Sequence, residues 1–168
     1  MRITEMHVTP IALGDPPLLN AAGLHAPYAL RTVVELVTDN GLHGLAEVPG
    51  SVAVEQALRD AREIVVGADP INWNALRAAL ATRFKGESTL ARGNKPWDSR
   101  TFVQVFSALD VACLDLQGRA FDVPVAMLLG GVVREQVPYS AYLFYKDEGA
   151  GGELGFGVDP KATGWAAA

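Results

Sequence analysis

The sequence predicts an α+β fold in which a three-stranded antiparallel meander precedes a helical bundle and one lone strand. Three observations support this fold class. Alternating and β-branched residues fill much of the first 48 positions, and apolar residues spaced by three and four fill residues 54–129. An aromatic stretch with strand character follows at residues 137–145. Strands that precede helices along the chain are typical of α+β proteins.

The meander is expected in residues 2–48. Residues 2–13 mix apolar side chains with threonines and predict the first strand, which a Gly-Asp-Pro-Pro sequence ends. Residues 31–38 are rich in β-branched side chains, and residues 42–48 return after the Asp-Asn-Gly turn at 39–41, which predicts a hairpin. Such a small sheet is stable only with another layer packed on one face.

Two helices are expected after the hairpin. The first ends at Gly67, and Asn72 can cap the second. The predicted inward-facing residues are Val54, Leu58, Ala61 and Val65 in the first helix, and Trp73, Leu76, Leu80 and Phe84 in the second.

A longer, central helix is expected next. Its apolar stripe consists of Phe102, Phe106, Leu109, Cys113, Leu116 and Ala120. Ala108 and Ala112 add a small face that another backbone can approach closely. Pro124 can open a short helix over residues 125–129, which the glycines at 130 and 131 end.

Two long loops and the lone strand complete the chain. Residues 18–28 and 85–100 are Gly- and Pro-containing or polar, and loops of this length often bind ligands. The strand at 137–145 has no obvious partner within the chain. Residues 146–168 show no period and indicate either a mobile loop or the start of an element that is cut short.

Length and composition indicate one domain with a real core, since 49% of the 168 residues are hydrophobic. The net charge of −5, without a run of basic residues, argues against a nucleic-acid surface. No stretch is long enough to span a membrane, and no apolar block opens the chain as a secretory signal would. The one cysteine, Cys113, lies on the apolar stripe, so a buried thiol and a cytoplasmic location are expected.

No catalytic or metal-binding motif is present. His7 and His43 lie in predicted strands and are interpreted as partly exposed or hydrogen-bonded structural residues. His25 lies in the first long loop, where a binding role and a structural role are both open. Asp110 and Asp115 are five residues apart on the central helix and do not face each other, which favours capping, exposure or a salt bridge over catalysis.

The residues beside the loops leave alternatives open. Arg31, Asp98 and Arg100 either hold the two long loops together or contact an anionic ligand. Alternation places Tyr142 and Phe144 on one face of the lone strand. Aromatic residues on a strand indicate a core or an interface, although a tyrosine at a strand end can also reach a ligand.

The string ALDVACLDLQGRAFDVPVAMLLGG at residues 108–131 resembles the helix that closes the N-terminal capping domain of the enolase superfamily. Three further stretches resemble its mandelate racemase/muconate lactonizing enzyme branch, and within it the glucarate dehydratases. They are LLNAAGLHAPYALR at 18–31, VELVTDNGLHGLAEVPG at 34–50 and SAYLFY at 140–145.

The resemblance implies a cap whose two long loops close over a (β/α)8 barrel and select the substrate. By position, Asn20 and His25 would hold the distal end of a dicarboxylic sugar acid, and Tyr142 and Phe144 would reach it from the first barrel strand. It also implies Mg2+ bound in the barrel and a dehydration that begins with proton removal α to a carboxylate. The second loop departs from the family pattern at Pro96, which leaves the preferred diacid open.

The resemblance further implies a capping domain at residues 1–131, followed at 132–168 by a linker, the first barrel strand and a loop. A barrel takes about 250 residues, so a truncated chain without catalytic residues is expected. The expected partners are a small dicarboxylic sugar acid, the barrel of the parent chain and further copies of the chain. The alternative is a non-catalytic binding or assembly module with a cap-like fold.

Overall fold

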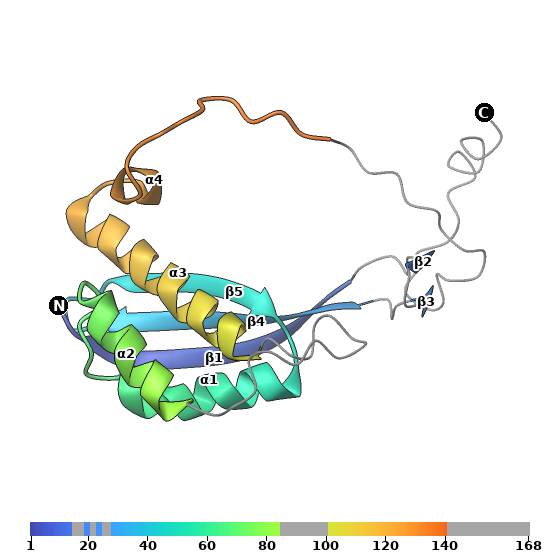
Figure 1. The fold of residues 1–168 in the computed structure, drawn as a ribbon, viewed down its shortest axis with the longest axis horizontal. Coiled ribbons are helices and arrows are strands. Elements are labelled where there is room, and N and C mark those ends of the chain that lie inside the picture. Colours follow the sequence, from blue (N-terminus) through green and yellow to red (C-terminus); the bar gives the residue numbers. More distant parts are fainter. Residues whose placement is uncertain (15–18, 21–22, 25–27, 85–100, 141–168) are drawn as a thin grey trace. The chain divides into compact units, whose positions relative to one another are not determined.

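The computed structural model describes residues 1–14, 19–20, 23–24, 28–84 and 101–140 of the chain. The chain divides into two compact units, each described by itself below. Unit 1 comprises Met1–Ile11 and Arg31–Glu135, and unit 2 comprises Ala12–Leu30 and Gln136–Ala168. Unit 1 contains the hydrophobic core and all of the long helices (Figure 1).

The main sheet confirms the predicted antiparallel meander. It consists of β1 (Ile3–Gly14), β4 (Tyr28–Thr38) and β5 (His43–Pro49) in the order β1-β4-β5. The β4–β5 hairpin turns at Gly41, whose φ of 78° is the left-handed conformation that the Asp-Asn-Gly sequence predicts. The Thr38 hydroxyl closes the turn by donating to the Asn40 amide oxygen at 2.6 Å.

Four helices follow the sheet. They are α1 (Val52–Val65), α2 (Trp73–Arg83), α3 (Thr101–Phe121) and α4 (Val125–Leu128). The Ser51 hydroxyl caps α1 by accepting from the Val54 amide at 3.2 Å. Asn72 is the N-cap residue of α2, as predicted, but its side chain makes no capping hydrogen bond. Instead, the Asn72 carbonyl accepts from the amides of Ala75 and Leu76.

One core joins the sheet to α1, α2 and α3. Its α3 members, each at most 1% exposed, are Val105, Ala108, Leu109, Ala112, Cys113 and Leu116. Phe102 and Phe106 are only partly buried and pack at the core's edge, where Phe106 also meets the ring of Trp73 edge-on. Ala120 is exposed, so the predicted apolar stripe ends one turn early, at Leu116.

The small face of α3 lies directly against a strand, as predicted. A Cβ built on Gly44 of β5 would overlap the Ala112 carbonyl oxygen and lie 2.5 Å from Leu116 Cγ. Only glycine fits at this position. The alanines at 108 and 112 are fully buried, so α3 and the β5 backbone approach closely.

The end of α3 and the short α4 also match the prediction. Asp122 adopts a φ of 53°, and the Val123 amide donates back to the Gly118 carbonyl at 2.9 Å, which together end α3. Gly130 and Gly131, with φ of 104° and 106°, end α4. Leu129, predicted within the short helix, follows it and is exposed.

Unit 2 contains a small pairing that the sequence did not predict. Within the first long loop, β2 (Leu19–Asn20) pairs antiparallel with β3 (Gly23–Leu24), and Asn20 lies opposite Gly23. Of the predicted strand at 137–145, residues 137–140 have no regular secondary structure. The other five lie outside the described residues.

Candidate substrate-capping site

The four candidate substrate-binding residues are described only in part. The backbone of Asn20 lies in β2, opposite Gly23. His25, Tyr142 and Phe144 lie outside the described residues, as do Pro96, Asp98 and Arg100. What can be described of the site is therefore the geometry of the strands and helices to which its two loops are connected.

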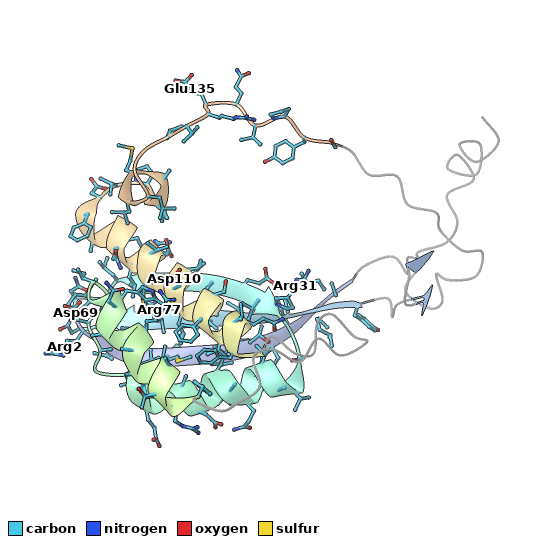
Figure 2. All side chains as sticks on the ribbon, in the orientation of Figure 1. Arg2, Arg31, Asp69, Arg77, Asp110 and Glu135 are labelled. Carbon is cyan, nitrogen blue, oxygen red and sulfur yellow. The ribbon has the colours of Figure 1, made fainter. Side chains whose placement is uncertain are left out.

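Both loops extend from one end of unit 1, called here the loop end and marked by Ile11, Arg31, Pro49 and Thr101. Arg31 pairs with Pro49, the last residue of β5, so the unit 1 portion of β4 begins where β5 ends. Since β1 is the antiparallel neighbour of β4, its unit 1 portion finishes there too. The helix α3 starts beside the same end, near Arg31 (Figure 2).

An ion pair fixes the strand that leads out of the first loop. Arg31 Nε lies 2.8 Å from Glu47 Oε1, across the β4–β5 hairpin. Both side chains are partly exposed, so the pair contributes at most about 1 kcal/mol to stability. Its effect is on geometry, because the pair holds β4 and β5 together at the loop end.

Aromatic contacts join the two residues that flank the second loop. The rings of Phe84, after α2, and Phe102, in the first turn of α3, lie 5.4 Å apart. Phe102 also meets Phe106 edge-on at 4.2 Å, and the Arg83 guanidinium lies 5.3 Å from the Phe84 ring centre. The second loop therefore begins and ends on one aromatic cluster, although its residues 85–100 are outside the described part.

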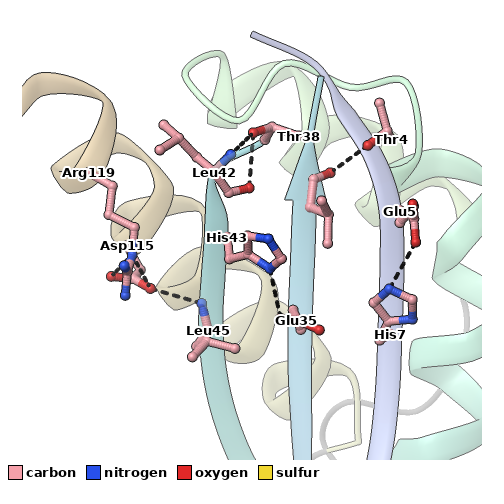
Figure 3. A network of polar contacts seen from close by, with 11 residues as sticks. Thr4, Glu5, His7, Glu35, Thr38, Leu42, His43, Leu45, Asp115 and Arg119 are labelled. Carbon is pink, nitrogen blue, oxygen red and sulfur yellow. Dashed lines mark hydrogen bonds and ion pairs between the residues drawn. The ribbon is translucent and has the colours of Figure 1, made fainter. Parts of the chain in front are cut away.

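The two strand histidines have the structural roles expected of them. His7 Nε2 lies 3.0 Å from Glu5 Oε2, and His43 Nδ1 lies 2.9 Å from Glu35 Oε1 (Figure 3). All four side chains are substantially exposed to solvent.

Asp115 links α3 to the edge of the sheet. Its carboxylate accepts from the Leu45 amide at 2.9 Å and from Arg119 Nε at 3.2 Å (Figure 3). The salt-bridge interpretation of this residue is confirmed, and the acceptor satisfies an amide on the outer edge of β5. Asp110, one and a half turns away, is half-buried.

Cys113 is a buried structural thiol. Burial raises the pKa of the Cys113 thiol from 9.0 to about 12, and the carboxylates of Asp110 and Asp69 add to the shift. The nucleophilic thiolate is therefore scarce at neutral pH.

The described residues contain no metal site. No group of three or more His, Cys, Asp or Glu side chains in the described ranges could hold an ion. Among these same residues, no helix is long and apolar enough to cross a membrane.

Sequence reasoning missed the Arg31–Glu47 pair and the glycine at 44. The hairpin register contained the first signal, because a turn at 39–41 places residues 31 and 47 diagonally across the two strands. For Gly44 the sequence contains only part of the information. The alanines of α3 predict the close approach of another backbone but do not identify the strand.

A three-stranded antiparallel meander packed on helices is the architecture of an enolase-superfamily capping domain. The family model for the mandelate racemase/muconate lactonizing enzyme N-terminal domain matches residues 25–130, and the chain belongs to this family.

Individual relatives agree with the assignment. A probable glucarate dehydratase from Streptomyces coelicolor is 39% identical, over 95% of this chain and 40% of its own length. A Thermobispora bispora enolase solved with magnesium and formate is 46% identical with a TM-score of 0.76, over 87% of this chain and 36% of that one. A Pseudomonas fluorescens enolase solved with magnesium, potassium and tartrate is 43% identical with a TM-score of 0.75, over 86% and 35%. The chain thus spans about 40% of the length of the first of these relatives.

Proposed function

We propose that this chain is the substrate-capping portion of an acid-sugar dehydratase of the glucarate dehydratase type. The observation that carries the proposal is the 39% identity to a probable glucarate dehydratase across 95% of the chain. Other relatives of lower coverage include a D-xylonate and a D-galactonate dehydratase. A small sugar acid is the substrate class that these names share.

In the proposed reaction, a base removes the proton α to the substrate carboxylate, and the β-hydroxyl group leaves as water. The cap would bind the other end of the substrate. The Asn20 amide, the His25 imidazole and the Tyr142 hydroxyl can each hydrogen-bond a hydroxyl or a carboxylate, and Phe144 would lie against the substrate from the same strand as Tyr142. Binding energy gained far from the reacting carbon helps to position that carbon.

The arrangement of the loop end supports this assignment. The first loop, which contains Asn20 and His25, returns into β4, where Arg31 pairs with Glu47. The second begins and ends at the contact of Phe84 and Phe102.

The proposal assigns residues 1–131 to the cap and residues 132–168 to the segment that leads into the first barrel strand. Two solved relatives bind magnesium. The described residues of this chain offer no group that could hold it, so we assign magnesium to residues elsewhere. There it would stabilise the negative charge that develops on the substrate carboxylate.

A chimera tests the proposed function. The matching N-terminal part of the Streptomyces coelicolor relative would be replaced by this chain, and dehydration of glucarate would be followed with Mg2+. Turnover well above that of the 168-residue chain alone, which is expected to give none, would support a capping role. A folded, metal-loaded chimera without turnover of glucarate, xylonate or galactonate would contradict it and favour the non-catalytic alternative.

A further inference from the structure

We draw no further inference here: the strongest candidate, the surface patch on the face of the β4–β5 hairpin opposite the core, where Val33, Glu35, Leu45 and Glu47 are half-buried or exposed, carries nothing because nothing in the described part of the structure shows what covers it.

Discussion

Replacing Gly44 with alanine tests the packing of α3 on the sheet. The added Cβ would overlap the Ala112 carbonyl oxygen and lie 2.5 Å from Leu116 Cγ. Carbon atoms in contact are normally about 3.5–4.0 Å apart, so helix and strand must separate by about 1 Å. The Ala112 contact is with the main chain, and no change of rotamer can relieve it.

The expected loss of folding stability comes from the core packing that this separation of helix and strand loosens. Leu109, Cys113 and Leu116 are fully buried in the same interface. Overpacking a well-filled core costs about 1–3 kcal/mol and sometimes more, and we expect the upper part of this range because a backbone atom is involved. Urea unfolding followed by circular dichroism measures the loss as a lower midpoint with an unchanged slope.

Two further variants make the result specific. The Cβ added by Gly41→Ala meets nothing within 4 Å. The expected loss of stability is therefore only that of holding an alanine at a φ of 78°, about 1–2 kcal/mol. Gly44→Ala combined with Leu116→Ala should not recover stability, because the Ala112 carbonyl remains. A free energy of unfolding for Gly44→Ala within about 0.5 kcal/mol of the unchanged chain would refute the close approach.

Three other variants or modifications test the core and its edge. Thr32, buried in β4, has a hydroxyl without a hydrogen-bond partner among the described residues. Thr32→Val should therefore raise the free energy of unfolding by about 1 kcal/mol. A loss of stability would show that the hydroxyl does have a partner. The Cys113 thiol, with its pKa near 12, should react with a disulfide reagent at pH 8 only after unfolding, and rapid reaction of the folded chain would contradict its burial. Because the unfolded thiol ionises near pH 9 and the folded one stays protonated, its contribution to stability is present below pH 9 and is lost as the pH rises toward 12. Asp115→Ala removes the acceptor of the Leu45 amide and should cost about 1 kcal/mol in urea unfolding, which Asp115→Asn should partly restore; equal losses in both variants would show that charge alone matters.

The spacing of apolar residues predicted the elements in which a regular row of side chains packs against the sheet or against another helix. The hairpin, α1, α3 and the glycine stop after α4 were all predicted. The prediction was wrong where a helix extends beyond the strand against which it packs. Ala120 continues the spacing of α3, but β5 begins near Leu116, so the last turn has no sheet to cover it. Asn72 has the right residue type for a cap, yet backbone bonds alone close the first turn of α2.

The candidate site could not be predicted in the same way. Asn20 and His25 lie in a loop, where no repeat links residue type to orientation. The pairing of Asn20 with Gly23 was missed because two-residue strands are too short to show alternation. For these residues and for Tyr142 and Phe144, only the resemblance to a family suggested a role, and that role stays a prediction.

The most direct test of the capping role is His25→Ala in the glucarate-dehydrating chimera, measured for both turnover and stability. Loss of one hydrogen bond to a charged substrate group should cost about 1.5–3 kcal/mol, which is roughly one to two orders of magnitude in kcat/KM. The melting temperature should hardly change. His7→Ala is the matched control, because His7 is an exposed strand histidine that pairs with Glu5, and it should leave kcat/KM unchanged. A His25→Ala chimera that keeps full activity but melts at a lower temperature would contradict the account and make His25 a structural residue.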